Sequence, residues 1–306
     1  MTSVVTGAFG YIGKSIAGQL IAQGEEVRTI TTHVSRPNPF AGAIAAFPYD
    51  FDQPERLTEH LQGATILYNT YWIRFEHAGL TFEQAVRNTA TLFECARAAG
   101  IRKIVHISVT RAYEDSPLPY YAGKARQERA LMELGLPYAV LRPTLVFGEG
   151  DILVNNIAWL MRHFPVFPIF GSGEYRLQPV FVGDLAELAI GASRRASSGS
   201  EDILGPEDFT FKQLAELIAA QVRPGLSLMQ VPPWAGIAAG RLIGWVVRDV
   251  ILTADELRGL MAEYLTSDEP PNGTTLFSEW VAKNKHSLGR RYASELARHF
   301  QSAGSA

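Results

Sequence analysis

Cysteine is nearly absent from this sequence. Cys95 is the single one among 306 residues, so a disulfide within the chain is excluded. The chain also has no large excess of positive or negative charge. Its formal net charge is -3, and no run of lysines or arginines occurs. That balance gives no electrostatic reason to expect nucleic acid. His77, His106 and His163 are scattered without the spacing of metal ligands, so we expect no metal site.

A long uninterrupted apolar run is also missing. The most apolar segment, residues 231–252, contains two prolines, two arginines and one aspartate, whereas a spanning helix needs about 20 nearly uncharged residues. We interpret it as a buried or partly exposed helix and weigh against association with a membrane surface. A strand pattern occupies the N-terminus, so we expect no signal peptide and a cytoplasmic location.

What the sequence does contain is typical of a globular protein with a sizeable core. Hydrophobic residues make up 47% of the chain and charged residues 19%. A chain of 306 residues can form one large domain, or a core domain with a smaller lobe.

A glycine-rich turn near the N-terminus is the most informative motif. Residues 4–13 read VVTGAFGYIG, in which β-branched residues lead to Gly7, Gly10 and Gly13 and a helical pattern follows. A strand that turns on glycines into a helix directs free backbone N–H groups and a positive dipole end at one place. Such a place suits a pyrophosphate, so the turn predicts a dinucleotide site that includes Phe9, Tyr11 and Ile12.

Strand and helix patterns alternate from there onward. The strands are expected at residues 26–31, 47–51, 64–68, 103–108 and 138–141, with helices between them. This alternation predicts an α/β fold: a Rossmann-type, doubly wound parallel sheet with a smaller, mostly helical C-terminal lobe. We assign residues 1–150 to the sheet domain, with returning strand segments near 175–205. Residues 151–174 and 206–306 form the expected lobe.

The end of the second expected strand bears on the choice between NAD and NADP. NAD sites place an acidic residue about 20 residues past the glycines, whereas a basic residue suits a 2′-phosphate. Here Thr31 is followed by His33 and Arg36, and no carboxylate occurs before Asp50. We therefore prefer NADP over NAD, with His33 and Arg36 as phosphate contacts.

Polar side chains also stand where the expected strands end. These are Asp50, Asn69, Ser108 and Arg142. Because parallel strands end at the same edge of a sheet, we expect these residues to converge on one crevice.

A tyrosine and a lysine share one face of the helix expected near Tyr120. Tyr120 and Lys124 are four residues apart, and an ammonium close to a phenol lowers the tyrosine pKa from its usual value of about 10. Such a tyrosine can exchange the proton when a carbonyl and an alcohol interconvert by hydride transfer.

Together these motifs resemble the short-chain dehydrogenase/reductase superfamily in its extended or atypical branches. The matching segments are residues 6–13 (TGAFGYIG), Ser108, residues 120–124 (YYAGK), 142–148 (RPTLVFG) and 180–186 (VFVGDLA). The likeness covers roughly the first 190 residues. Within the superfamily the chain is similar to the subgroup of bacterial NAD-dependent epimerases or dehydratases and the dinucleotide-binding accessory subunit of respiratory complex I.

The resemblance implies roles for individual residues. Tyr120 would be the acid/base, Lys124 would hold the nicotinamide ribose and tune Tyr120, and Ser108 would hydrogen-bond the reacting oxygen. The expected cofactor-binding residues are Gly7, Phe9, Gly10, Tyr11, Ile12, Gly13, His33, Arg36, Asp50, Phe51, Asn69, Thr70, Tyr71, Lys124 and Pro143.

Three departures from the family pattern leave alternatives open. Thr110 could replace Ser108, and Tyr121 is a second candidate for the role of Tyr120. Tyr71 and Trp72 stand where the family has small residues, so they either narrow the nicotinamide site or line an aromatic pocket.

We therefore expect an NAD(P)-dependent oxidoreductase or epimerase/dehydratase that acts on a small carbonyl or alcohol substrate. The alternative is a dinucleotide-binding sensor or complex-assembly subunit without turnover. A homodimer is compatible with either.

Overall fold

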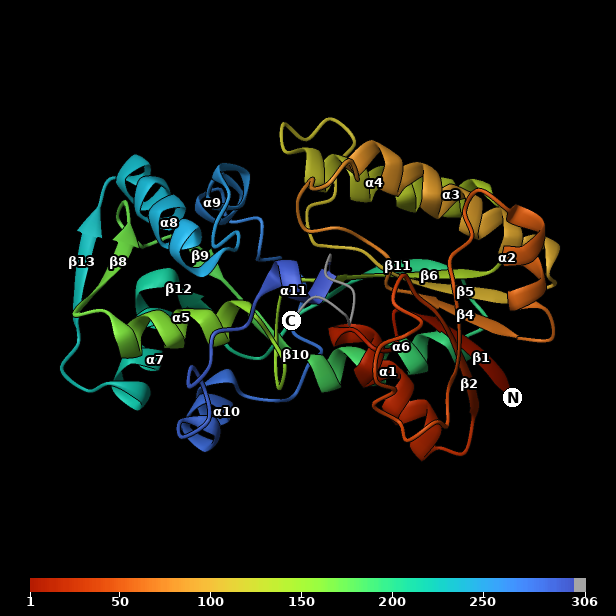
Figure 1. Ribbon diagram of the computed structural model, residues 1–306, viewed down its shortest axis with the longest axis horizontal. Helices are drawn as coiled ribbons and strands as arrows, with labels where there is room; N and C mark the ends of the chain where they lie inside the picture. The colour runs from red at the N-terminus through yellow and green to blue at the C-terminus, as the bar shows by residue number, and fades with distance from the viewer. Residues whose placement is uncertain (300–306) are drawn as a thin grey trace. The chain divides into compact units, whose positions relative to one another are not determined.

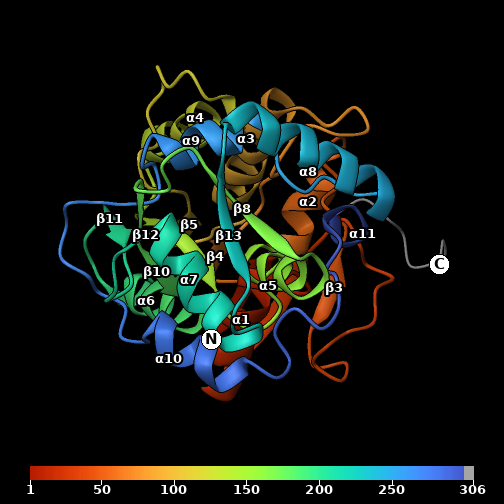
Figure 2. The same cartoon turned by 90° about the vertical axis from the view of Figure 1, so that its left-hand side faces the viewer.

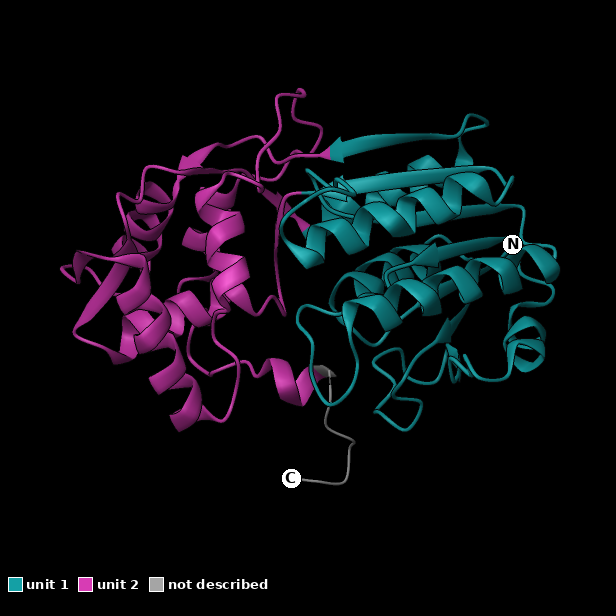
Figure 3. Ribbon diagram, turned by 90° about the horizontal axis from the view of Figure 1, so that it is seen from above, with its two compact units in different colours: residues 1–143, 182–202, 306 teal, residues 144–181, 203–305 magenta. Residues whose placement is uncertain are grey.

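The computed structural model describes residues 1–299, which form two compact units (Figure 3). Unit 1 contains Met1–Pro143 and Val182–Asp202, and unit 2 contains Thr144–Phe181 together with the described residues from Ile203 onward. Of the segment expected to return to the sheet domain, Val182–Asp202 lies in unit 1, whereas residues 175–181 lie in unit 2. The last part of the expected lobe, residues 300–306, lies outside the described residues.

Unit 1 is built on a seven-stranded sheet with the strand order β11-β6-β5-β4-β1-β2-β3. The registers from β6 to β3 are parallel throughout. The order reverses between β1 and β4, which is where sheets of this kind bind ligands. The strands are β1 (Thr2–Thr6), β2 (Glu26–Ile30), β3 (Ala45–Phe47), β4 (Ile66–Asn69), β5 (Lys103–Ile107), β6 (Tyr138–Pro143) and β11 (Gly199–Ile203).

Helices cover both faces of this sheet (Figure 1). One face carries α2 (Pro54–Leu61), α3 (Phe82–Ala98) and α4 (Pro119–Glu133), and the other carries α1 (Tyr11–Ala22) and α6 (Val182–Arg194). Every residue of β4 and β5 is buried, as expected of central strands covered on both sides. The expected Rossmann-type doubly wound fold is confirmed.

Side chains of α1 fasten α6 to unit 1. The Ser15 hydroxyl donates to the Val182 carbonyl at 3.2 Å, and the Gln19 amide donates to the Gly183 carbonyl at 2.9 Å. These bonds join α1 to the first turn of α6, a segment far along the chain, on one face of the sheet.

Unit 2 is mostly helical and has its own core. Helices α5 and α7 and the rings of Phe147, Phe211 and Phe277 belong to this core, and Phe147 and Phe277 meet edge-on at 5.0 Å. The helices are α5 (Leu153–His163), α7 (Phe211–Val222), α8 (Pro233–Val247), α9 (Ala254–Met261), α10 (Phe277–Asn284) and α11 (Glu295–His299). The strands are β7 (Leu145–Phe147), β8 (Val166–Phe170), β9 (Arg176–Leu177), β10 (Pro179–Phe181), β12 (Phe209–Thr210) and β13 (Ser227–Val231).

The structure corrects one local prediction in unit 2. The prolines and aromatic residues of the stretch 164–171 predict a connection after the preceding helix. In the structure this stretch contains β8, which pairs in parallel with β13 (Figure 2). Pro168 is tolerated because β8 belongs to a two-stranded sheet in which its missing N–H costs little. The pairing partner lies far along the chain, so local sequence pattern could not reveal it.

The third glycine of the turn is required by packing. A Cβ at Gly13 would lie 2.4 Å from the Gly7 carbonyl oxygen and 2.9 Å from that of Thr6. We expect Gly13→Ala to lower the free energy of unfolding by about 1–3 kcal/mol, because backbone atoms must move. Urea denaturation measures the change. Gly191→Ala on α6 is the control: its Cβ meets nothing within 4 Å, so stability should stay level or rise by up to about 1 kcal/mol. Equal losses in the two variants would contradict the packing argument.

Candidate active site

The glycine turn forms an anion site at the start of α1. Gly7 has φ +63°, and its carbonyl accepts the Gly10 N–H at 2.8 Å. Helix α1 begins at Tyr11, its N-cap Gly10 has no capping side chain, and its first turn has no acidic residue. The N–H groups of that turn and the positive end of the helix dipole are therefore available to a phosphate.

The clearances around the glycines fit a dinucleotide. A Cβ at Gly10 would lie 3.1 Å from the Gly7 carbonyl oxygen, and one at Gly7 would lie 3.4 Å from Thr70 Oγ1. Side chains here would fill the space beside the backbone N–H groups. Phe9, Tyr11 and Ile12 are half-buried around the same turn. The cradle that the sequence predicts is thus present, and its residues fit a pyrophosphate.

Hydrogen bonds join the turn to the end of β4. Thr70 N–H donates to Thr6 Oγ1 at 2.7 Å, and Thr70 Oγ1 donates to the Thr6 carbonyl at 2.6 Å. The Asn69 amide, which is fully buried, accepts from Thr6 Oγ1 at 3.1 Å and donates to His106 Nδ1 at 3.0 Å. Asn69 therefore connects three strand ends, and Thr70 and Tyr71 are the residues next to it that reach the half-buried surface.

His106 is neutral in this setting. Burial, with a smaller contribution from the charge of Lys124, lowers the pKa of His106 well below its ordinary value. Because its Nδ1 accepts from Asn69, its proton lies on Nε2. His106 is thus a structural side chain between the sheet and Phe93, whose ring it meets edge-on at 5.7 Å.

The loop after β2 brings His33 and Arg36 together. The His33 N–H donates to Thr31 Oγ1 at 3.2 Å, and the Arg36 N–H donates to the His33 carbonyl at 3.1 Å. Both side chains are half-buried in a loop at the carboxyl end of β2. This placement agrees with a contact to a ribose substituent, which stays a prediction.

Three aromatic residues that follow β3 and β4 pack together at the carboxyl end of the sheet. Phe51 stacks on Tyr49 with ring centroids 4.8 Å apart, and Tyr71 meets both rings at 4.8 and 5.2 Å. Strand β3 ends at Phe47, earlier than predicted, and Asp50 follows at φ +42°. Its carboxylate pairs with His60 at 3.2 Å.

Helix α4 presents Tyr120 and Lys124 as predicted from their spacing. Pro119 occupies the first turn, so the helix begins just before Tyr120. Lys124 is 3% exposed, and its Nζ donates to the Ile107 carbonyl at 2.8 Å. Burial lowers the pKa of Lys124 to about 7, although the Glu128 carboxylate opposes this shift. The lysine thus lies at the carboxyl end of β5 and can change charge near neutrality.

Trp72 connects the two residues. The Lys124 ammonium lies 5.1 Å from the centre of the Trp72 ring, and the Tyr120 ring meets the same indole edge-on at 5.8 Å. A Cβ at Gly123 would lie 2.6 Å from the indole, so this glycine makes room for it. Phe82 also stacks on this indole, with ring centroids 5.6 Å apart. Tyr120 and Lys124 therefore face the same aromatic ring.

Ser108 directly follows β5, and its side chain contacts Glu128 of α4. The Ser108 hydroxyl donates to the Glu128 carboxylate, which also accepts from Arg142 Nε at 3.0 Å. Ser108 and Glu128 are buried. Thr110, the alternative hydroxyl, is also buried, and its N–H donates to the Pro143 carbonyl at 3.1 Å. The sequence reasoning missed Glu128, although its position four residues after Lys124 on the same helix face could have revealed it.

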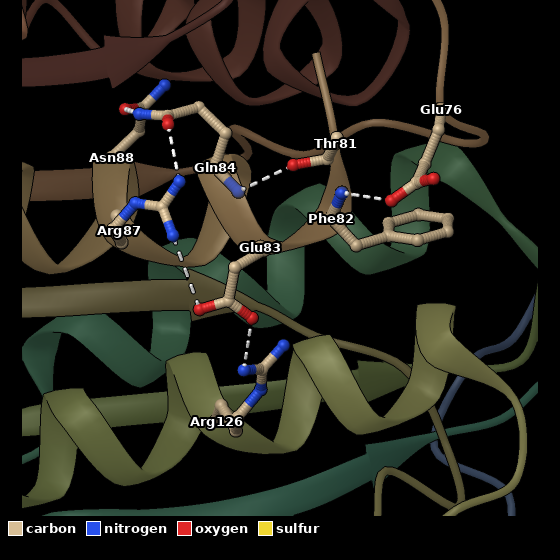
Figure 4. A network of polar contacts seen from close by, with 8 residues as sticks. All are labelled: Glu76, Thr81, Phe82, Glu83, Gln84, Arg87, Asn88 and Arg126. Atoms are coloured by element: carbon tan, nitrogen blue, oxygen red, sulfur yellow. Dashed lines mark hydrogen bonds and ion pairs between the residues drawn. The ribbon is translucent and has the colours of Figure 1, made fainter. Parts of the chain in front are cut away.

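A polar network holds α3 against α4 beside this site (Figure 4). The Phe82 N–H donates to Glu76 at 2.9 Å, and Thr81 caps the helix by accepting the Gln84 N–H at 3.1 Å. Glu83 binds Arg126 of α4 at 2.6 Å. Asn88 donates to the Tyr71 hydroxyl at 2.9 Å. The network positions the segment that contains Trp72 and Phe82.

Among residues 1–299, no group of three or more His, Cys, Asp or Glu side chains is arranged so that it could hold a metal ion. Over the same residues, no helix is long and apolar enough to cross a membrane.

Fold and site define a Rossmann-type dinucleotide-binding protein. The model of the NAD dependent epimerase/dehydratase family matches residues 3–204, and the chain belongs to this family. The resemblance inferred from the motifs is thereby confirmed.

Individual relatives are distant. The chain is 24% identical over 291 residues to the mitochondrial NADH dehydrogenase [ubiquinone] 1 alpha subcomplex subunit 9 of Arabidopsis thaliana, covering 88% of this chain and 71% of that protein. A nucleoside-diphosphate-sugar epimerase from Staphylococcus aureus superposes with a TM-score of 0.73 at 17% identity, over 92% of this chain and 100% of the other. Triphenylmethane reductase from Citrobacter sp., complexed with NADP(H), gives 0.64 at 19% identity, over 93% and 100%.

The buried lysine predicts a pH-dependent stability. Its pKa of about 7 lies below the usual 10.5, so between these values the unfolded chain binds more protons and the free energy of unfolding rises with pH. Below pH 7 both states are protonated and the cost of burying the charge is complete. We expect Lys124→Met to be more stable than wild type by a few kcal/mol below pH 7, and less so as the pH approaches 10.5.

Urea denaturation at one pH below 7 and one just below 10.5 measures this difference. Lys14→Met, which changes an exposed lysine of α1, is the control and should follow wild type at both. A Lys124→Met gain that is the same at both pH values would show that burial of the charge is not its cause.

Proposed function

We propose that this chain is an NAD(P)-dependent oxidoreductase or epimerase/dehydratase that acts on a small carbonyl or alcohol substrate. The observation that carries the proposal is the shared contact of Tyr120 and Lys124 with Trp72, because it puts a phenol and a buried amine on one side of α4. Membership of the epimerase/dehydratase family supports it.

The residues of unit 1 divide the work. Backbone N–H groups at Gly10 to Gly13 would hold the pyrophosphate, and Thr70, Tyr71 and Pro143 would contact the rest of the dinucleotide. A nicotinamide bound there would supply or accept the hydride. Tyr120 moves the proton to or from the substrate oxygen, and the cationic form of Lys124 favours the phenolate and binds ribose hydroxyls.

Two hydroxyl groups after β5 are candidates for a hydrogen bond to the reacting oxygen. Ser108 was predicted for this role, and its hydroxyl is hydrogen-bonded to Glu128. Thr110 is the second candidate at the end of the same strand. Whichever acts, the Glu128–Arg142 pair holds the segment around Ser108 in place.

A specific observation favours the alternative function, a dinucleotide-binding subunit without turnover. Trp72 lies over the Lys124 ammonium where the family has small residues, and Lys124 donates to the Ile107 carbonyl. The Arabidopsis relative is a subunit of NADH dehydrogenase, which is consistent with this alternative.

Turnover by variants separates the two functions. We expect Tyr120→Phe to lower kcat roughly a hundredfold or more, because the proton donor is lost, while the dinucleotide still binds. Tyr121→Phe removes the hydroxyl of the second candidate for this role and should keep its activity if Tyr120 is the proton donor. The assay follows nicotinamide absorbance with aldehydes and ketones. With sugar nucleotides it follows product formation by chromatography, because an epimerase or dehydratase restores its cofactor in each cycle. Turnover equal in wild type and Tyr120→Phe would refute the mechanism, and binding without any turnover would favour the alternative.

Cofactor choice is tested separately by titrating NADPH and NADH against the fluorescence of the protein. We propose NADP as the preferred form of the cofactor. The cytoplasmic location is a separate prediction that this titration does not address. Arg36→Ala should weaken NADPH binding by about 10- to 100-fold, as expected when a charge-assisted hydrogen bond is lost. NADH affinity serves as the internal control and should not change. Tighter binding of NADH than of NADPH by wild type would overturn the assignment.

A further inference from the structure

Helix α8 buries glycines and exposes its large apolar side chains, the reverse of the usual arrangement in an amphipathic helix. Its buried residues are Gly236 and Gly244. A Cβ at Gly236 would lie 2.1 Å from the Phe170 ring of β8, and one at Gly244 would lie 2.5 Å from the Asp249 carbonyl oxygen. Gly236 thus lets α8 lie close against β8 of unit 2, and Gly244 lets the chain turn back tightly at Asp249 (Figures 1 and 2). The large apolar side chains are left on the outer face.

That outer face exposes an unusual amount of apolar surface. Trp234 is 73% exposed, Leu242 66%, Trp245 80% and Val246 68%. At 100° per residue these positions fall on one side of the helix, opposite the glycines. Single exposed apolar residues are common, but a contiguous group that includes two tryptophans marks a binding surface.

The charges on this face have one sign. Arg241 and Arg248 are exposed, and Asp249 is the single carboxylate between Gly225 and Ala254. Asp249 is buried and accepts from the Tyr292 hydroxyl at 2.8 Å and from the Glu295 N–H at 2.8 Å, so it does not offset the arginines. An open hollow lined by Trp245, Val246 and Arg248 brings apolar and cationic groups together.

We propose that α8 binds the surface of anionic lipid bilayers and lies in the plane of the interface. Trp234, Leu242 and Trp245 would enter the boundary between headgroups and acyl chains, where tryptophan is favoured. Arg241 and Arg248 would lie against lipid phosphates. The helix has 15 residues, too few to span a bilayer, so it binds the surface.

Charge favours a lipid surface over a second copy of the chain. If α8 packed on α8 of another copy, four arginines would approach without an exposed carboxylate from this segment, and like charges oppose such pairing. A layer of lipid phosphates neutralises both arginines of each chain. This proposal departs from the sequence-based expectation, in which residues 231–252 form a buried or partly exposed helix without association with a membrane surface.

Vesicle flotation tests the proposal on the whole chain. The probes are vesicles of pure phosphatidylcholine and vesicles of equal parts phosphatidylcholine and phosphatidylglycerol. We expect wild type to float with the anionic vesicles at least about tenfold more than with the neutral ones. The double variant Trp234→Ser/Trp245→Ser should lose at least about tenfold of this binding, and Arg241→Gln/Arg248→Gln should lose the preference for anionic lipid.

A matched control replaces two exposed apolar residues of unit 1. Tyr113→Ser/Met132→Ser should float as wild type does, and thermal melting checks that every variant is folded. The proposal is overturned if wild type does not float with anionic vesicles, or if the tryptophan variant floats as well as wild type. If wild type does not float, sedimentation equilibrium tests the other occupant. A dimer that the tryptophan variant dissociates would assign the exposed face of α8 to a second copy of the chain.

Discussion

The close approach of α1 to the end of β1 is the constraint on which the cofactor site depends. Gly13 permits this approach, because any side chain would collide with the carbonyls of Gly7 and Thr6. The same contact directs the first N–H groups of α1 at the point where the strand order of the sheet reverses. The hydrogen bonds between Thr6 and Thr70 then tie this point to β4. Phosphate binding and sheet geometry are therefore determined by one set of backbone contacts.

Helix α4 organises the proposed catalytic residues in a similar way. Three residues of this helix contact neighbouring segments. Gly123 lies against the indole of Trp72, Lys124 donates to the end of β5, and Glu128 binds Ser108 and Arg142. The buried lysine is costly to ionise, and its pKa of about 7 is the consequence. An amine that gains or loses its charge near neutrality beside a tyrosine is a feature of sites that transfer protons. The Trp72 indole lies against the same lysine and occupies space beside it. This arrangement is compatible with a protein that binds a dinucleotide without turnover.

Unit 2 shows how packing can reverse the usual relation between hydrophobicity and burial. In α8 glycine lies inside and tryptophan outside, because the helix lies so close to β8 that larger side chains do not fit. The resulting surface carries a free-energy cost in water unless something covers it. Its arginines and tryptophans indicate the chemistry of what would cover it.

The sequence by itself determined the α/β class, the glycine turn and the shared helix face of Tyr120 and Lys124. These are local features, set by glycine conformation and by a helical period of 3.6 residues. Tertiary structure decided what lies far apart in the chain. It paired β8 with β13, directed the Ser108 hydroxyl to Glu128 and placed Trp72 against Gly123. It also turned the apolar residues of α8 outward. The amino-acid composition of a helix indicates how much apolar surface it has. Which side of the helix is buried depends on how neighbouring elements pack against it.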